Sequence, residues 1–90
     1  MQDNREEKIL KAAVAKWGEL QLVKIMEEAG ELIQACSRRI LGQEDKEHNL
    51  EEEIADMEIM LGQAKIIADK EVVDRWKEIK LQKLEKRLKV

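Results

Sequence analysis

The feature that most constrains the fold is an apolar stripe at helical spacing in the second quarter of the chain. Its members alternate four and three residues apart: Leu22, Met26, Ala29, Ile33, Cys36 and Ile40. Residues at that spacing share one face of an α-helix, so the pattern predicts a helix from about Glu19 to Leu41 with this face in the core. Leu20, Val23 and Leu32 lie off the stripe, so more than one face should be covered.

Capping signals predict three more helices. The predicted N-caps are Asp3, Asn49 and Asp69, and the glycines predicted to end helices are Gly18 and Gly42. A polar stretch from Gln43 to His48 reads as a loop. The chain has no proline and is rich in strong helix formers. The expectation is one all-α domain of four helices over residues 1–90.

Composition narrows the classes of partner. The net charge of −3 gives no reason to expect nucleic acid, and the apolar runs are too short to span a membrane. The N-terminus lacks the pattern of a signal peptide, and the single cysteine excludes an internal disulfide. A cytoplasmic protein is therefore expected. A chain this short buries only about 60–65% of its unfolded surface, which makes self-association a natural supplement.

Two acidic clusters are the candidate site. They read Glu27-Glu28-Ala29-Gly30-Glu31 and Glu52-Glu53-Ile54-Ala55-Asp56. Each holds two carboxylates three residues apart, which lie on neighbouring parts of one helix face. Four carboxylates from two facing helices could therefore converge on one small volume. Like charges held so close repel unless a cation or protons compensate them.

Helical phase separates these acids. At roughly 100° per residue, Glu53 falls inside the apolar arc of the third predicted helix, and Asp56 falls on its edge. Glu52 points away and is expected to cap the helix or face solvent. Carboxylates are rarely placed among apolar neighbours without a partner. Carboxylate oxygens without nearby histidine or cysteine favour Mg²⁺ over zinc. The competing interpretation is a set of ordinary solvated faces, because 41% of the residues are charged.

Several of these residues resemble one family. Trp17-Gly18, Gln21, Glu27 to Leu32, Ala35, and Glu53 to Asp56 are similar to motifs of the MazG-like all-α nucleoside triphosphate pyrophosphohydrolases. The family signature is ExxE followed, after a variable gap, by ExxD. Here it reads Glu28-x-x-Glu31 and Glu53-x-x-Asp56. The resemblance extends from about Trp17 to about Arg87.

The resemblance implies an activity and an assembly. Such proteins cleave a nucleoside triphosphate, often a deoxynucleotide or a non-standard one, to the monophosphate and pyrophosphate. The implied Mg²⁺ ligands are Glu28, Glu31, Glu53 and Asp56, with Mn²⁺ as a substitute ion. A carboxylate-activated water attacks the α-phosphorus, and Glu27 and Glu28 are both candidate bases. The implied fold is a four-helix protomer whose bundle is completed in a homodimer or a dimer of dimers.

Substrate contacts are predicted at both ends of the chain. Lys80, Lys83 and Arg87 resemble the late basic motif of the family, which contacts phosphates; Leu84 stands where that motif often has asparagine. Further candidates are Trp17 for stacking on a base, Gln21 for a base or sugar, and Lys24 for a phosphate. The alternatives are packing or an interface for Trp17, and ordinary surface positions for Gln21, Lys24, Lys80 and Lys83.

Two other functions remain open from the sequence. A phosphoribosyl-ATP pyrophosphohydrolase would share the fold and the acidic residues. A non-catalytic helical module that associates with itself would explain the thin core and the long amphipathic helices. The preferred base and sugar are not encoded in any recognisable motif.

Overall fold

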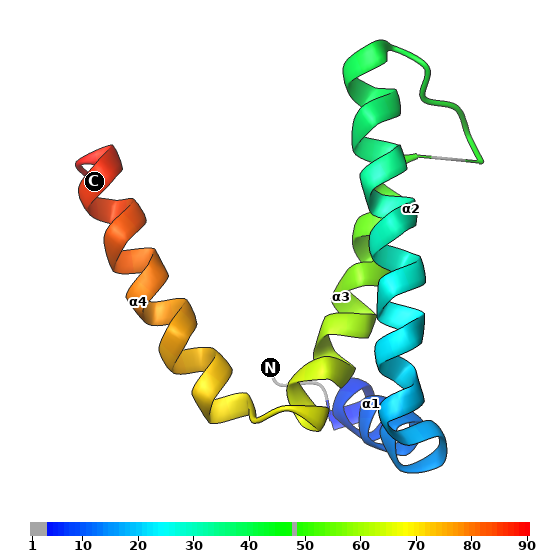
Figure 1. The fold of residues 1–90 in the computed structure, drawn as a ribbon, viewed down its shortest axis with the longest axis vertical. Coiled ribbons are helices and arrows are strands. Elements are labelled where there is room, and N and C mark those ends of the chain that lie inside the picture. Colours follow the sequence, from blue (N-terminus) through cyan, green and yellow to red (C-terminus); the bar gives the residue numbers. More distant parts are fainter. Residues whose placement is uncertain (1–3, 48) are drawn as a thin grey trace.

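The computed structural model describes residues 4–47 and 49–90, and within them every regular element is helical, which confirms the all-α prediction. The elements are α1 (Asn4–Trp17), a short 3₁₀ turn η1 (Gly18–Leu20), α2 (Gln21–Leu41), α3 (Leu50–Ile67) and α4 (Lys70–Leu88). Figure 1 shows α2 and α3 side by side, α1 packed near one end of this pair, and α4 diverging from it. The predicted Asp3 cap and the His48 end of the predicted loop lie outside the described residues.

Local chemistry sets the helix boundaries largely as predicted. Gly18 and Gly42 adopt φ values of 60° and 71°, which favour glycine, and they follow α1 and α2 directly. The Asn49 side chain accepts the Glu52 N–H at 2.8 Å, and Asp69 accepts N–H bonds at the start of α4. The second helix begins at Gln21, close to the predicted start near Glu19, and the 3₁₀ turn η1 comes directly before it.

The core is small and lies where α3 meets α1 and α2. Its buried apolar side chains are Leu10, Ala35 and Met60, joined by buried Glu53 and Gln63. A Cβ added at Gly62 would lie 2.6 Å from Leu10 Cδ1, so a larger residue there would force the Leu10 side chain to shift. A core of this size leaves much of the apolar surface uncovered.

The predicted core stripe of α2 is wrong for the single chain. Ile33 is 69% exposed and Ile40 is 84% exposed, and Cys36 is exposed as well. The face that meets α3 instead carries Glu28, Leu32 and Ala35, which are buried or half-buried. Apolar periodicity identifies a face that avoids water, but it does not say whether the same chain covers that face.

The third and fourth helices show the same discrepancy. Ile54 and Leu61 of the predicted α3 stripe are exposed, whereas Met60 is buried. Trp76, predicted to pack, is exposed on α4. In α4 only Val73 is even half-buried, although the helix contacts α3 and its Asp74 lies 3.3 Å from Lys65 Nζ.

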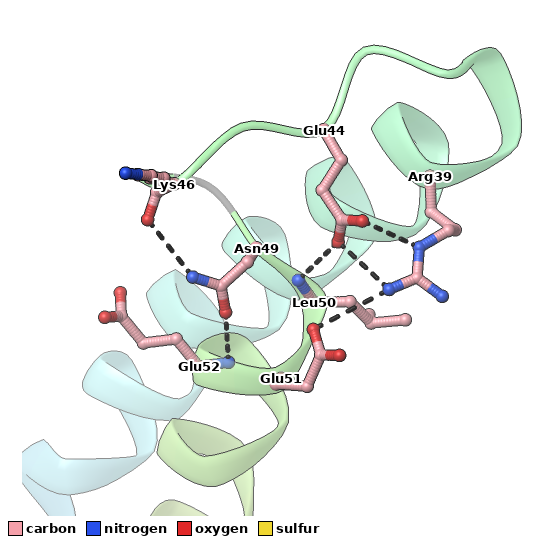
Figure 2. Close-up of polar contacts among 7 residues, drawn as sticks. All are labelled: Arg39, Glu44, Lys46, Asn49, Leu50, Glu51 and Glu52. Atoms are coloured by element: carbon pink, nitrogen blue, oxygen red, sulfur yellow. Dashed lines mark hydrogen bonds and ion pairs between the residues drawn. The ribbon is translucent and has the colours of Figure 1, made fainter.

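The connection between α2 and α3 is fastened at both ends, as Figure 2 shows. Arg39 Nε donates to Glu44 Oε1 at 2.8 Å, while Glu44 Oε2 accepts the Leu50 N–H at 2.7 Å. The Asn49 side chain also donates to the Lys46 carbonyl at 3.1 Å. These bonds fix the first turn of α3 against the last turn of α2. The pKa of Glu44 is lowered by the Arg39 guanidinium and by the Leu50 N–H.

Among the described residues, none of the helices combines the length and the apolar character needed to cross a membrane. The longest of them, α2, carries charged side chains on the face turned to α3 and along its flanks. Its apolar stripe is therefore one face of a mixed helix.

Candidate metal centre

The α2–α3 pair brings together the four carboxylates that the sequence singled out. Glu28 and Glu31 come from α2, and Glu53 and Asp56 come from α3. One oxygen of each lies within 4.8 Å of one oxygen of every other. The three-residue spacing places each pair on one helix face, and the packing of α2 on α3 turns the two faces toward each other.

Burial divides the cluster into a shielded half and an open half. Glu53 is only 8% exposed and the Glu28 side chain only 12%, whereas Asp56 is half-buried and Glu31 exposed. Glu28 Oε2 and Glu53 Oε2 are both buried and have no hydrogen-bond partner among the described residues. A buried carboxylate oxygen without a partner is costly, and it is uncommon in folded proteins.

The electrostatics follow from this crowding. Burial raises the pKa of Glu53, and the nearby charges of Glu31 and Asp56 raise it further. Burial likewise raises the pKa of Glu28, followed by the charge of Glu31, while Lys24 opposes the rise. Both shifts mean that the folded chain disfavours the charged form of these groups. A bound cation would reverse that preference, because it attracts the carboxylates that now repel one another.

A pocket of about 350 Å³ opens beside the cluster. Its described lining residues are Glu31, Gln34, Arg38, Glu47, Glu52, Glu53 and Asp56. Three of the four clustered carboxylates therefore face a space that a ligand could enter. Arg38 is the single basic side chain in this described lining, and sequence reasoning missed it. The signal was present, since Glu31, Gln34 and Arg38 are spaced three and four residues apart on α2.

Glu27 and Lys24 lie at the edge of the site. Lys24 Nζ is 3.5 Å from Glu27 Oε2 and 3.6 Å from Glu28 Oε1. The Glu27 side chain is 62% exposed and does not belong to the group of four converging carboxylates. Lys24 thus pairs with carboxylates, and its role as a phosphate contact stays a prediction.

The candidate base and sugar contacts have other partners. Gln21 Nε2 donates to Gln63 Oε1 at 2.7 Å in a part-buried bond that joins α2 to α3. Trp17 is exposed, with Lys16 Nζ 5.3 Å from its ring centroid. Gln21 therefore has a structural role within the chain, and the stacking of Trp17 on a base stays a prediction.

The three late basic residues are not brought to the carboxylates in the single chain. Lys80, Lys83 and Arg87 are exposed on α4 and do not line the acidic pocket. Figure 1 shows α4 leading away from α2 and α3 along its length. Lys80 Nζ lies 5.9 Å from the Trp76 ring centroid, so these two residues lie on one side of α4.

Comparison of the chain with protein-family models, with curated proteins and with solved structures finds no match. The kind of ion that the cluster could hold is argued from its four carboxylate side chains. All four are carboxylates from rigid helices, and such oxygen donors suit a hard divalent cation such as Mg²⁺. The residues present fit this ion, because two of their buried oxygens have no other partner in the described chain.

Proposed function

We propose that Glu28, Glu31, Glu53 and Asp56 hold Mg²⁺, for which Mn²⁺ can substitute, and that the chain hydrolyses a nucleoside triphosphate to the monophosphate and pyrophosphate. The observation that carries this proposal is the convergence of four carboxylates around two buried oxygens that have no partner among the described residues. Four ordinary solvated acids would instead keep their oxygens in water. The substrate class comes from the family resemblance of the same four residues.

A cation held there supplies neutralising charge for phosphate oxygens and a lower pKa for a coordinated water. Of the two candidate bases, Glu28 fits better than Glu27. The Glu28 side chain is shielded and belongs to the group of converging carboxylates, whereas the Glu27 side chain is 62% exposed and lies outside that group. In the step proposed, the water oxygen bonds to the α-phosphorus, Glu28 takes the water proton, and the bond to the bridging oxygen of pyrophosphate breaks.

We also propose that the site is completed by a second copy of the chain, in a homodimer or a dimer of dimers. The carboxylates lie on α2 and α3, whereas the basic residues lie on α4. Residues 1–69 carry nine basic and sixteen acidic side chains, and residues 70–90 carry eight basic and four acidic ones. This opposite charge, together with the uncovered apolar faces, favours packing of α4 against another copy. The four-helix protomer would then complete a bundle between subunits.

One observation also favours the non-catalytic alternative. The apolar faces of α2 and α4 are exposed in the single chain, as expected for a helical module that only associates with itself. The two functions differ at the carboxylates. A chain that only associates with itself does not require two buried oxygens without partners. It also should not show a rise in melting temperature with Mg²⁺.

The direct test is pyrophosphate release from a panel of deoxynucleoside and ribonucleoside triphosphates and phosphoribosyl-ATP, with Mg²⁺. Glu53→Gln should lower the rate by more than the roughly 10- to 100-fold that loss of an outer-shell partner of a metal site costs. Glu58→Gln is the matched control, since Glu58 is an exposed carboxylate on the same helix and outside the cluster. Release from no member of the panel, or full activity of Glu53→Gln, would contradict the proposed hydrolase.

A further inference from the structure

Arg38 stands at the far end of the acidic pocket from the carboxylate cluster. It lies seven residues after Glu31 on α2, which places it on the same helix face about 10 Å further along the axis. Gln34 lies between them and lines the same pocket. The pocket is therefore lined by three of the four clustered carboxylates and, further along α2, by one guanidinium.

The pairing of Arg38 differs from that of its neighbour Arg39. Arg39 lies 2.8 Å from Glu44 and 3.6 Å from Glu51, so its charge fastens the loop. Arg38 is half-buried, and Nη2 donates to Gln34 Oε1 at 3.3 Å. Although five carboxylates line its pocket, none in the described chain comes within the 4.0 Å ion-pair distance of Arg38. A guanidinium has five N–H donors, so most of them remain available to a ligand.

We propose that Arg38 binds the terminal phosphates of the substrate, the part that leaves as pyrophosphate. This inference rests on the proposed hydrolase and adds the direction of the substrate: its pyrophosphate end points toward the C-terminal end of α2. A guanidinium can donate two parallel hydrogen bonds to one phosphate, which fixes orientation as well as charge.

The surrounding charges explain why such a residue is needed. Glu47 and Glu52 also line the pocket as exposed carboxylates, and they repel a phosphate. Phosphates that extend along α2 from an ion held near Glu31 toward Arg38 would therefore meet only carboxylates and Gln34 in the described lining if Arg38 were absent. Arg38 supplies a positive partner from the same chain, and it stabilises the negative charge that develops on the leaving oxygen.

The test is the binding of inorganic pyrophosphate in the presence of Mg²⁺, measured by titration calorimetry on the full chain. Arg38→Gln should bind about 10- to 100-fold more weakly, which corresponds to the loss of a hydrogen bond between charged groups. Arg38→Lys should recover part of the affinity, because it keeps the charge but not the paired donors. Lys8→Gln removes the same charge from an exposed position on α1 and should leave the affinity unchanged.

Several results would overturn the assignment. One is equal pyrophosphate affinity in Arg38→Gln and the wild type, and another is no pyrophosphate binding by the wild type. An unchanged pyrophosphate affinity with a raised KM for triphosphates of one base would reassign Arg38 to the base. The two proposals fail separately. Binding that depends on Arg38 without release from any triphosphate contradicts only the hydrolase, whereas release with pyrophosphate binding insensitive to Arg38 contradicts only the present inference.

Discussion

The α2–α3 pair and α4 differ in which side chains they bury and in the charge that they carry. The pair turns a partly charged face inward, where Glu28 and Glu53 are shielded, and is fastened by the Arg39–Glu44 contact. In α4 nearly every residue is exposed, and the helix and the residues after it carry a positive balance of charge. Each region therefore lacks what the other has: the pair holds concentrated negative charge, and α4 holds cations beside uncovered apolar side chains.

This difference indicates that packing within one chain is enough to form the carboxylate cluster, whereas the proposed complete site needs contacts between chains. The carboxylate cluster needs only the packing of α2 on α3 within one chain. The meeting of acidic and basic residues needs contacts that the single chain does not make, because Lys80, Lys83 and Arg87 do not line the acidic pocket. Variants in the two regions should therefore differ in whether they change folding or association.

The largest effect is expected in the core. Leu10→Ala removes a buried side chain that packs on Gly62 and should cost about 2–5 kcal/mol of unfolding free energy. Leu88→Ala makes the same change on exposed α4 and should stay within about 0.5 kcal/mol at concentrations where the chain is monomeric. Urea unfolding of both variants measures the contrast. Equal losses would show that α4 is as firmly packed as α1.

Substitutions on α4 should change the self-association of the chain more than its folding. Trp76 is a large exposed side chain beside Lys80, so Trp76→Ser should shift the sedimentation profile of the protein toward the monomer. The wild-type melting temperature should rise with protein concentration, and this dependence should weaken in the variant. Gln82→Ser, an exposed and uncharged change on the same helix, serves as the control. A wild type that sediments as a monomer at all concentrations would rule out the proposed assembly.

The two confirmed N-caps give a smaller and more local contrast. Removing an N-cap side chain costs about 1 kcal/mol of helix stability. Asn49→Ala should lower global stability by about that amount, because α3 carries much of the core. Asp69→Ala should fray α4 and change global unfolding less, since α4 packs little. Hydrogen exchange along α3 and α4 distinguishes fraying from global loss, and a greater global loss in Asp69→Ala would reverse the expectation.

The smallest effect is expected from the ion pair between Arg39 and Glu44, whose contribution to stability depends on pH. The folded pKa of Glu44 is lowered, so its contribution to stability is present above its unfolded pKa and is lost as pH falls through the folded value. The raised pKa of Glu53 acts in the opposite direction. The difference in melting temperature between wild type and Glu44→Gln should therefore shrink toward acid pH. A difference that stays constant from neutral to acid pH would exclude the Arg39–Glu44 contact as its source.

Local signals in the sequence predicted the helices and the cluster well. Asn49 and Asp69 cap their helices through their own side chains, so their roles depend on only a few neighbouring residues. The phase of Glu53 within α3 likewise marked it as shielded, and it is among the most buried residues. These features repeat at the fixed geometry of the α-helix, which is why the sequence alone reveals them.

What the sequence did not predict depends on tertiary packing. Ile33 and Ile40 form a regular stripe, yet the structure turns them away from the core. The periodicity is identical whether the same chain or a partner covers that face. The spacing of Arg38 from Glu31 placed both residues on one face of α2, but the pocket that they line also depends on the positions of α3 and of the loop, which the sequence did not predict. The divergence of α4 has no sequence signal at all.

The measurement that tests the central claim most directly is the melting temperature with and without Mg²⁺, for wild type, Glu53→Gln and Glu58→Gln. Without the metal, Glu53→Gln should melt above wild type, because it removes a buried charge without a partner. At Mg²⁺ concentrations a hundred times the Kd, wild type and Glu58→Gln should gain about 2.7 kcal/mol, a rise on the order of 10 °C, and Glu53→Gln should gain little. A wild-type melting temperature that ignores Mg²⁺, or an equal rise in Glu53→Gln, would contradict a metal centre at these four carboxylates.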